Sequence, residues 1–341
     1  MSEKTLVTFR KKVALRMQYY LKKNFGSNTR AYQLLSDYPT RPGKGIRPIF
    51  CLAAAASVGG DYNNAVNTAT AIELFHNSFL IKDDIVDQSV YRRGDLTLDR
   101  KYGLALAANA GDAVKILGMS PLIDNLKLIG VRKALQIILE IQEMARRSVE
   151  GQIIELTYVR ENRLSLKPRD YFNICENKTC WYTIIAPCRT GIIIGSDDAT
   201  PEMLDAITRF ALNTGIAFQI TDDTLNLTAS QKLYGKEING DILEGKRTLM
   251  LIHLLQSCSK EEKAKMKQIL KTPREAKTDA DVAYVMELLE TYACVEYARK
   301  TAEKFALKAR KILVNECDWM TEKRWKQFFF KQTDYLVMRK K

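Results

Sequence analysis

Most of the chain shows apolar residues recurring every three or four positions, which is the spacing of one face of an α-helix. Two segments, 25–45 and 95–103, are bounded or interrupted by proline or glycine and are predicted to be loops. The alternation typical of strands is scarce. The pattern therefore predicts an all-α fold with helices over 6–24, 48–58, 62–87, 104–128, 131–160 and 201–228, and a helical, basic C-terminal region over 260–341.

The 341 residues could form one large domain or two, and no linker rich in proline, glycine and serine divides them. Apolar residues make up 46% of the chain, which is enough for a sizeable core. We therefore expect residues 1–341 to form a single domain. No stretch approaches the roughly 18 consecutive apolar residues of a membrane span. Since the N-terminus also lacks the apolar region of a signal peptide, we expect a soluble, cytoplasmic protein.

The net charge of +13 favours anionic partners, such as diphosphates, an acidic membrane surface or nucleic acid. No nucleic-acid-binding motif is present, so we expect no nucleic-acid partner. The segment 319–341 mixes tryptophan and phenylalanine with lysine and arginine, a pattern compatible with peripheral contact to a membrane. Packing of the aromatic side chains against the core is the favoured interpretation. The seven cysteines show no disulfide-scaffold spacing, so we expect reduced core thiols.

An acidic cluster ends the helix predicted over 62–87. Asp83 and Asp87 share one helix face, one turn apart, and Asp84 lies beside them. Like charges at this spacing cost a few tenths of a kcal/mol, and burial raises the cost unless a cation lies between them. An ordinary solvated helix end is the competing interpretation, since runs of acids usually face water.

A second acidic cluster favours the metal-site interpretation. In the segment FQITDDTLN, Asp222 and Asp223 repeat the acid pair, and Asn226 takes the place that Asp87 holds in the first cluster. A few hard oxygen ligands suit Mg²⁺, which keeps some waters and is readily bridged by phosphate oxygens. Neither cluster alone forms a closed metal site. Two facing clusters could hold a diphosphate through shared metal ions.

These motifs resemble those of the trans-isoprenyl diphosphate synthases, the head-to-tail prenyltransferase family. The segment DDIVD followed by RRG, and the segment FQITDD, match the two aspartate-rich motifs of the family. Four more segments match in the family's order: PGKGIRP at 42–48, EGQIIE at 150–155, NKTCWYT at 177–183 and GKEINGDILEGKRT at 235–248. The resemblance spans about residues 41–255. It implies an isoprenoid-synthase-type helical bundle around a central apolar cavity, and a homodimer.

The activity implied by the resemblance is Mg²⁺-dependent condensation of isopentenyl diphosphate with an allylic diphosphate. About three Mg²⁺ ions would stabilise the charge of the diphosphate leaving group without needing a proton. Their implied ligands are Asp83, Asp87 and Asp222. The neighbouring Asp84 and Asp223 would not bind the metal ions directly. They would support the groups that do, or orient waters.

The resemblance also implies which basic and polar side chains contact the two substrates. The residues implied at the allylic diphosphate are Arg92, Lys178 and Lys236, with Thr179 lining the path of the carbocation. The residues implied at isopentenyl diphosphate are Lys44, Arg47, His76 and Arg93. Gln219 and Lys246 are further implied substrate contacts, and Gln152 and Glu155 are implied to lie near the metal ions.

Product length is implied to depend on the helix before Asp83, whose side chains would form the floor of the product cavity. Ser78 is small and leaves room for the chain to grow, whereas Phe75 and Phe79 could limit the depth. We therefore favour geranylgeranyl diphosphate (C20) as the product, followed by C15 and C25 products.

Two other functions compete with condensation. A class I terpene cyclase would need both metal motifs but no isopentenyl diphosphate site. The presence of Lys44, Arg47, His76 and Arg93 therefore favours condensation. A non-catalytic regulatory subunit would tend to lose acids, and both acid pairs are present. Asn226 departs from the third acid of the second motif, but an amide oxygen can still serve as a neutral ligand.

Overall fold

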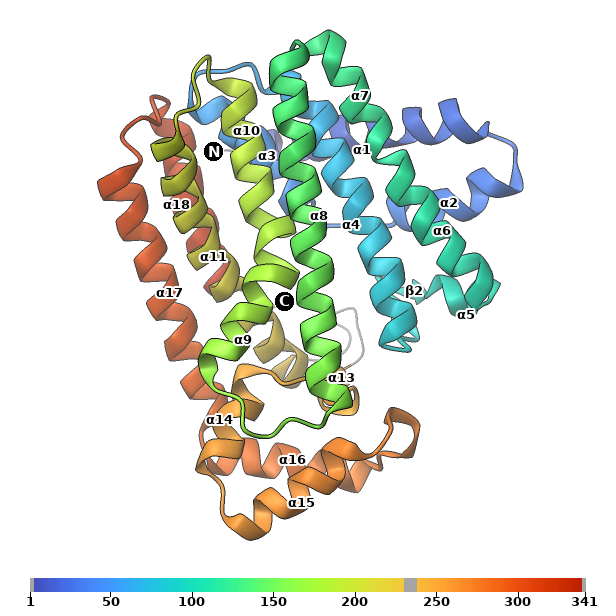
Figure 1. Cartoon of the computed structure of the whole chain (residues 1–341), viewed down its shortest axis with the longest axis vertical. Coiled ribbons are helices and arrows are strands. Elements are labelled where there is room, and N and C mark those ends of the chain that lie inside the picture. Colours follow the sequence, from blue (N-terminus) through green and yellow to red (C-terminus); the bar gives the residue numbers. More distant parts are fainter. Residues whose placement is uncertain (1–2, 230–237, 339–341) are drawn as a thin grey trace. The chain divides into compact units, whose positions relative to one another are not determined.

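The computed structural model describes residues 3–229 and 238–338. Helices dominate these residues, and their only strands are β1 (Tyr91–Arg92) and β2 (Asp95–Leu96), which form an antiparallel ribbon (Figure 1). The all-α prediction is confirmed. None of the described helices has the length and apolar character needed to span a bilayer.

The first part of the chain holds α1 (Glu3–Phe25), α2 (Arg30–Thr40), α3 (Ile46–Ser57), η1 (Tyr62–Ala65), α4 (Val66–Val86), α5 (Leu98–Tyr102), α6 (Leu104–Leu117), α7 (Met119–Leu128) and α8 (Val131–Arg160). The second part holds α9 (Pro168–Ile174), the π-helix η2 (Cys175–Ile185), α10 (Ala186–Gly195), α11 (Pro201–Thr228), α13 (Gly240–Leu243), α14 (Leu249–Ser257), α15 (Lys260–Lys271), η3 (Arg274–Ala276), α16 (Asp279–Thr291), α17 (Cys294–Glu316) and α18 (Lys323–Met338). The helices predicted over 131–160 and 201–228 have the expected bounds.

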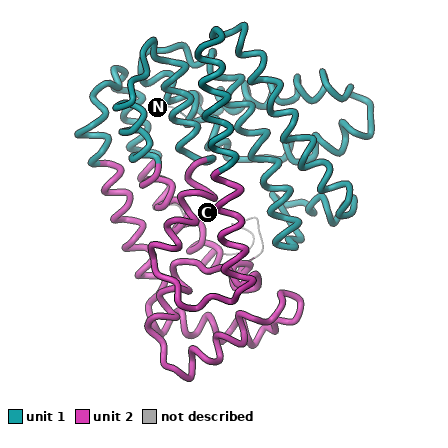
Figure 2. The backbone as a smooth tube through the Cα atoms, in the orientation of Figure 1, with its two compact units in different colours: residues 1–146, 182–211, 311–332 teal, residues 147–181, 212–310, 333–341 magenta. Residues whose placement is uncertain are grey.

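The chain forms two compact units, each built from three separate segments (Figure 2). Unit 1 comprises residues 1–146, 182–211 and 311–332. Unit 2 comprises residues 147–181, 212–310 and 333–341. The first acidic cluster therefore belongs to unit 1 and the second to unit 2.

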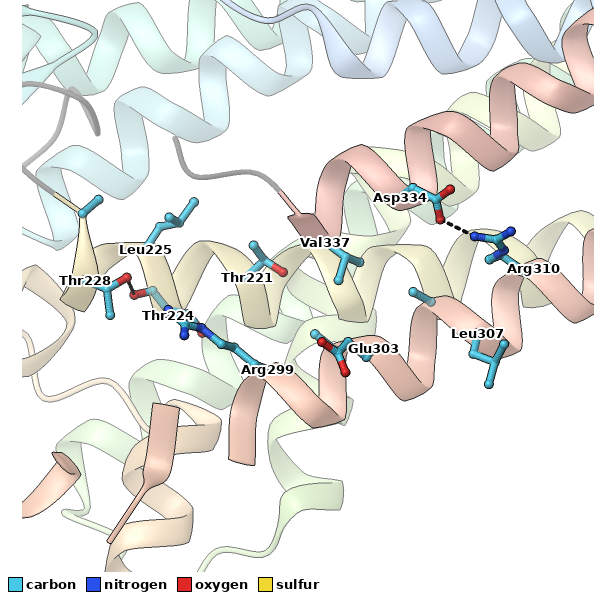
Figure 3. Close-up of a pocket in the computed structure, with 13 residues that line it drawn as sticks. Thr221, Thr224, Leu225, Thr228, Arg299, Glu303, Leu307, Arg310, Asp334 and Val337 are labelled. Carbon is cyan, nitrogen blue, oxygen red and sulfur yellow. Dashed lines mark hydrogen bonds and ion pairs between the residues drawn. The ribbon is translucent and has the colours of Figure 1, made fainter. Parts of the chain in front are cut away.

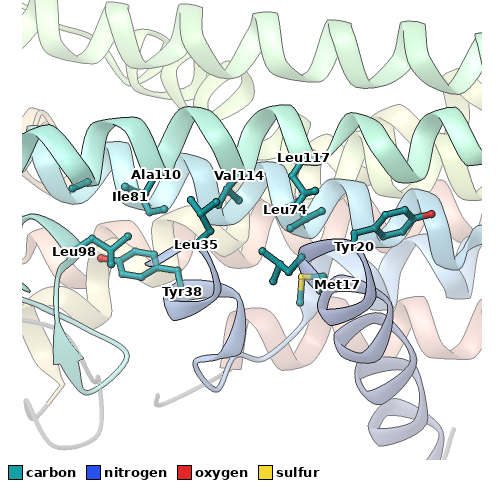
Figure 4. Packing of buried hydrophobic residues seen from close by; sticks show 12 residues of the cluster. Met17, Tyr20, Leu35, Tyr38, Leu74, Ile81, Leu98, Ala110, Val114 and Leu117 are labelled. Atoms are coloured by element: carbon teal, nitrogen blue, oxygen red, sulfur yellow. The ribbon is translucent and has the colours of Figure 1, made fainter. Parts of the chain in front are cut away.

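Helix α4 forms the centre of unit 1, where it packs against α1, α3, α6 and α7. Its apolar residues surround the helix instead of following one face, which is typical of a helix buried on all sides. Figure 4 shows side chains of α1, α2, α4, α5 and α6 packed into one apolar cluster. This packing holds the acidic end of α4 in a rigid frame.

The aromatic segment of α18 packs inside unit 1. Trp325, Phe328 and Phe329 are buried. The ring of Trp325 stacks on Phe9 with centroids 5.6 Å apart, and the ring of Phe329 lies 5.8 Å from that of Phe50. The three side chains therefore stabilise the core, which is the packing that the amphipathic pattern favours.

Unit 2 combines parts of long helices with several short helices that have side-chain caps. The hydroxyls of Thr248, Ser259 and Thr278 accept backbone N–H groups at the starts of α14, α15 and α16. Helix α14 packs against α9 and α16. Phe172 and Phe305 add an edge-to-face contact between α9 and α17, with centroids 5.0 Å apart. These contacts form the core that supports the second acidic cluster.

Two segments predicted to be loops and one predicted helix differ from the structure. The segment 25–45 contains α2, because Thr29 caps the helix by accepting the Tyr32 N–H and the helix buries Leu35 and Tyr38. The segment 95–103 contains β2 and α5. The helix predicted over 104–128 breaks at Gly118, since Pro121 has no N–H to continue the hydrogen-bond ladder.

Candidate active site

The first acidic cluster lies where α4 ends. Asp83 and Asp87 are both half-buried, and the Asp87 N–H donates to the Asp83 carbonyl oxygen at 2.8 Å. Their carboxylates thus come from one helix face, as the spacing predicts. Asp84 is rotated about 100° from Asp83 and is only 1% exposed. The two neighbouring acids therefore occupy different environments.

Asp84 is engaged by two side chains. Its carboxylate forms a buried ion pair with Arg92, whose Nε lies 2.9 Å from Oδ1 and 3.0 Å from Oδ2. The Tyr38 hydroxyl donates to Oδ2 at 2.6 Å. Burial raises the pKa of Tyr38 and the Asp84 carboxylate adds to the rise, so this hydroxyl remains a donor. Asp84 therefore anchors Arg92.

A cluster of basic side chains lies beside the part of α4 that precedes the acids. Arg47 Nη1 lies 3.2 Å from His76 Nε2, and Arg93 Nη2 lies 3.5 Å from the same nitrogen. The Arg47 guanidinium also stacks on the ring of Tyr182, 4.4 Å from its centroid. Burial raises the pKa of Glu73, and Arg47 and Arg93 oppose that rise. Two guanidinium groups beside the same His76 nitrogen form an attractive site for an anion.

The loop before α3 supports this cation cluster. At Gly43, an added Cβ would lie 3.2 Å from Arg93 Cζ, so the glycine lets the guanidinium pack closely against the backbone. The neighbouring Lys44 is exposed. The four residues predicted to bind isopentenyl diphosphate, Lys44, Arg47, His76 and Arg93, therefore all belong to unit 1.

An aromatic wall follows the same side of α4. The Phe79 ring lies 5.5 Å from that of Tyr182 and 6.4 Å from that of Phe75. Phe75 packs against Gly118, where an added Cβ would lie 2.8 Å from the ring. Ser78 is fully buried, and its hydroxyl has no hydrogen-bond partner in the described part of the chain. The side chains predicted to limit product length are thus packed within unit 1.

In the second acidic cluster, Asp223 is buried and Asp222 half-buried. The Tyr171 hydroxyl donates to Asp223 Oδ2 at 2.7 Å, and Gln219 Nε2 donates to Oδ1 at 2.6 Å. Burial raises the pKa of Asp223, although these two hydrogen bonds oppose the rise. Gln219, predicted as a substrate contact, therefore orients Asp223. The cluster repeats the arrangement of the first one, with one fixed acid beside a more exposed acid.

Asn226 has a structural role in this cluster. Its Oδ1 accepts the Asp241 N–H at 3.1 Å, and its carbonyl oxygen accepts the Asn239 N–H at 3.0 Å. Asp241 is a further acid that sequence reasoning missed. Burial raises the pKa of Asp241; Lys246 opposes the rise, and Asp223 and Asp222 add to it. The available signal was its place in the matched segment GKEINGDILEGKRT, since no helical spacing links it to the second acidic motif.

Lys178 lies in the π-helix η2, a form often found at functional sites. It forms an ion pair with Glu155 of α8. At Gly151, an added Cβ would lie 2.2 Å from the Lys178 backbone nitrogen, so only glycine permits this approach. Thr179 is buried next to Lys178. The amide nitrogen and oxygen of Gln152 are both buried, and they lack a hydrogen-bond partner among the described residues, as expected of groups that bind a polar ligand.

Lys246 and Lys236 are the other two lysines predicted to contact substrate. Lys246 forms an ion pair with Glu244, and its Nζ lies 3.8 Å from Asp241 Oδ1. Lys236 lies outside the described residues. Unit 2 therefore brings Lys178 and Thr179 together in η2, and Asp223 and Gln219 together on α11.

A pocket of about 890 Å³ lies elsewhere in unit 2, between α11, α17 and α18 (Figure 3). Thr221, Thr224 and Thr228 line it from α11. Helical spacing places these threonines on the side of α11 opposite to Asp223 and Asn226. The pocket is therefore separate from the second acidic cluster.

The donor chemistry of both clusters fits Mg²⁺. The carboxylates of Asp83, Asp87 and Asp222 are half-buried, so they can reach an ion while remaining accessible to water. Within residues 3–229 and 238–338, no three histidine, cysteine, aspartate or glutamate side chains form a metal-binding group by themselves. Mg²⁺ is typically held by one or two carboxylates, with waters and substrate phosphates as its other ligands.

Comparison with known proteins agrees with the motifs. A family model described as polyprenyl synthetase matches residues 29–289. The geranylgeranyl diphosphate synthase of Saccharolobus solfataricus is 31% identical over 297 residues, covering 86% of this chain and 85% of that protein. A geranylgeranyl pyrophosphate synthetase structure from Pyrococcus horikoshii is similar with a TM-score of 0.83 and 28% identity, covering 96% of this chain and 95% of that chain. A Caulobacter crescentus polyprenyl synthase complexed with calcium and isoprenyl diphosphate gives a TM-score of 0.83 and 25% identity, covering 100% and 98%.

An all-α fold of the isoprenoid-synthase type, carrying two aspartate-rich clusters, defines the class of this protein. The chain belongs to the polyprenyl synthetase family, because the family model matches most of its length. It is a prenyltransferase that elongates prenyl chains. The resemblance inferred from the motifs is confirmed.

Proposed function

We propose that this prenyltransferase condenses isopentenyl diphosphate with an allylic diphosphate in a Mg²⁺-dependent reaction. The observation that carries the proposal is the cluster of Arg47, Arg93 and His76 in unit 1, beside the helix that bears the first acids. This cluster is a candidate site for a second diphosphate, in addition to the one that the acidic motifs would hold through metal ions. A cyclase that ionises a single diphosphate would have no use for such a site.

We propose Asp83, Asp87 and Asp222 as the ligands that would hold the metal ions, as the resemblance of the motifs implies. When bound, about three Mg²⁺ ions would neutralise the charge that develops on the diphosphate leaving group. Each cluster has too few carboxylates to complete a coordination shell, so diphosphate and water oxygens would supply the remaining ligands. The relative from Caulobacter crescentus, whose structure holds calcium and isoprenyl diphosphate, supports this use of a divalent ion.

The chain's own cations would bind the two substrates. Arg92, held by Asp84, and Lys178, held by Glu155, would bind the allylic diphosphate together with Lys236. The cation cluster of unit 1 would hold isopentenyl diphosphate so that its double bond faces the developing cation. A guanidinium that is already oriented loses less entropy when it binds, so more of its interaction energy is available for the reaction.

The aromatic wall would exclude water and shape the product. Phe79 and Tyr182 present ring faces and edges that can stabilise a nearby carbocation and keep water away from it. The small side chain of Ser78 leaves room for growth, with Phe75 as the deeper limit. We propose a C20 product, geranylgeranyl diphosphate. The name of the relative from Saccharolobus solfataricus supports this length.

We also propose that the enzyme is a homodimer. Within unit 1, helices α6, α7 and α8 expose large apolar side chains, which we name the apolar face, with Ile116 71% exposed and Leu139 65% exposed. The other members of this apolar face are Leu104, Leu106, Met119, Ile123, Leu128, Val131 and Leu135. Exposed apolar surface of this extent is typical of an interface between subunits. Two copies that associate through the same face would bury it in both.

The reaction can be tested with isopentenyl diphosphate and dimethylallyl, geranyl or farnesyl diphosphate, using product mass as the readout. We expect a linear elongated diphosphate, no product in EDTA, and recovery on adding Mg²⁺. Asp83→Ala and Asp222→Ala should each lower the rate at least about 100-fold, because lost stabilisation of several kcal/mol corresponds to at least that factor.

Asp205→Ala is the matched control, since Asp205 is an exposed acid that pairs with Arg209 one turn along the same helix. It should keep the wild-type rate. A cyclised hydrocarbon from a single substrate would identify a cyclase instead. Wild-type rates in the Asp83 and Asp222 variants would contradict the metal assignment.

A further inference from the structure

Arg92 and Arg93 lie on a hairpin that is too small to hold its own shape. Strands β1 and β2 have two residues each and pair only through Tyr91 with Leu96 and Arg92 with Asp95. The two turn residues, Arg93 and Gly94, have φ values of 54° and 83°. This left-handed conformation suits a tight hairpin but is unfavourable for a residue with a side chain. An isolated two-stranded ribbon is marginal in water, so other contacts must fix this one.

Arg41, which follows α2, supplies these contacts. Its Nη1 donates to the Arg92 carbonyl oxygen at 2.7 Å, and its Nη2 donates to the Leu96 carbonyl oxygen at 2.7 Å, so one guanidinium holds both strands. Asp37 of α2 accepts from Arg41 Nε at 2.7 Å. The guanidinium also lies over the ring of Tyr38, 4.4 Å from its centroid. Asp37 and Tyr38 therefore hold the Arg41 guanidinium in the orientation in which it bonds to both strands.

Tyr38 acts on the side chain of Arg92. Its hydroxyl donates to Asp84 Oδ2 at 2.6 Å, and the same carboxylate accepts from Arg92 Nε. Tyr38 and Asp84 are each 1% exposed, so neither has room to turn. The ion pair uses Nε and Nη2 of Arg92, and Nη1 is the part of the guanidinium that the pair does not engage. The carboxylate therefore sets the direction of Nη1.

We propose that Tyr38 and Arg41 are positioning residues that orient Arg92 toward the diphosphate of the allylic substrate. Arg41 fixes the backbone of Arg92, and Tyr38 fixes its side chain through Asp84. The inference rests on the proposed function, which assigns Arg92 to that diphosphate. Together, residues 37–41 form the α2 strap, a segment without acidic-motif residues that sets the geometry of the motif's arginine. Orienting a binding group in advance lowers the cost of binding and of reaching the transition state.

The sharpest test is Tyr38→Phe, which removes the hydroxyl and keeps the ring beneath Arg41. Tyr20→Phe is the matched control: Tyr20 is also fully buried in the same apolar cluster, and its hydroxyl donates to Asp124 at 2.8 Å. We expect Tyr38→Phe to raise the KM for the allylic diphosphate about tenfold, since a hydrogen bond to a charged group is lost. The KM for isopentenyl diphosphate should change less than about twofold, and Tyr20→Phe should change neither KM.

Arg41→Lys provides a second variant, because lysine keeps the charge but cannot bond both strands at once. It should also raise the KM for the allylic diphosphate, which keeps the test valid if Tyr38→Phe folds poorly. Thermal unfolding of the Tyr38 and Tyr20 variants should shift by similar amounts. A purely structural role would then predict equal kinetics in the two variants.

Arg92→Gln separates this inference from the proposed function. If Arg92→Gln leaves the KM for the allylic diphosphate unchanged, the assignment of Arg92 to that substrate fails, and the inference fails with it. If Arg92→Gln raises this KM, Tyr38→Phe should have little further effect in the Arg92→Gln background. A full additional effect in that background, or Tyr38→Phe kinetics equal to those of Tyr20→Phe, would overturn the positioning role alone.

Discussion

At the scale of single residues, adjacent acids of one motif have separate roles. Asp83 is half-buried, whereas Asp84 is buried in contact with Arg92 and Tyr38. Asp222 and Asp223 show the same division, with Asp223 bonded to Tyr171. The cause is helical rotation, since consecutive residues point about 100° apart and only one of the pair can face away from the core.

We expect product length to depend on a few side chains of α4. We expect Phe75→Ala or Phe79→Ala to give a longer product, because each substitution removes a ring from the aromatic wall. Ser78→Phe should give a shorter product, since it fills a fully buried position. Product mass spectrometry measures the length, and Phe305→Ala, which removes a ring from α17, should leave it unchanged. An unchanged product from both alanine variants would place the floor of the cavity elsewhere.

At the scale of elements, small residues decide how closely helices pack. The segment of α3 from Cys51 to Ala56 packs against α10, where an added Cβ at Gly191 would lie 2.3 Å from the Cys51 carbonyl oxygen. An added Cβ at Gly195 would lie 2.2 Å from the Ala55 carbonyl oxygen. These backbone atoms cannot move aside without separating the helices. The glycines therefore set the distance between α3 and α10 in unit 1.

Gly191→Ala should lower the free energy of unfolding by about 1–3 kcal/mol, the usual cost of overpacking a core. Gly111→Ala on α6 is the matched control, because its Cβ would meet only Lys82 and Ile81 side-chain atoms at 3.4 Å or more. This control should be neutral or gain up to about 1 kcal/mol from the higher helix propensity of alanine. Urea unfolding measures both values. Equal stability of the two variants would contradict the close packing.

At the scale of the whole molecule, the apolar face of α6, α7 and α8 predicts a homodimer. Leu139→Asp and Ile123→Asp should shift the protein to a monomer, because each places a charge in an apolar interface. Val314→Asp is the matched control, since Val314 is 56% exposed but lies on α17, outside this face. Light scattering after size-exclusion chromatography measures the mass. A monomeric wild type, or dimers from all three variants, would contradict the prediction.

The sequence predicts the long helices better than the connections. Helices α8 and α11 have their predicted bounds because their apolar spacing is continuous over many turns. Helix α2 is missed because it is short and carries Pro39, and its stability depends on burying Leu35 and Tyr38 against other helices. The close approach of the Phe75 ring to Gly118 could not be predicted either, because Phe75 lies far away in sequence.

The sequence predicts the charged side chains of the candidate site but misses residues that hold them in place. The acidic motifs and the residues Arg47, Arg92 and Lys178 could be identified because their spacing matches a known family. Tyr38 could not, since a lone tyrosine in a loop-like segment carries no pattern. Asp241 lies in the matched segment GKEINGDILEGKRT, but that match did not show that it joins the second acidic cluster. Their importance appears only when their partners are known.

By itself, the sequence determined the helical class, the family and the charged groups available for chemistry, because periodicity and motif spacing are properties of the chain alone. Tertiary structure alone decided which acids are fixed and by which partners. Tyr38 meets Asp84 across 46 positions of sequence, and Arg41 meets Leu96 across 55. Such contacts form only when separate helices pack, and no local pattern specifies them.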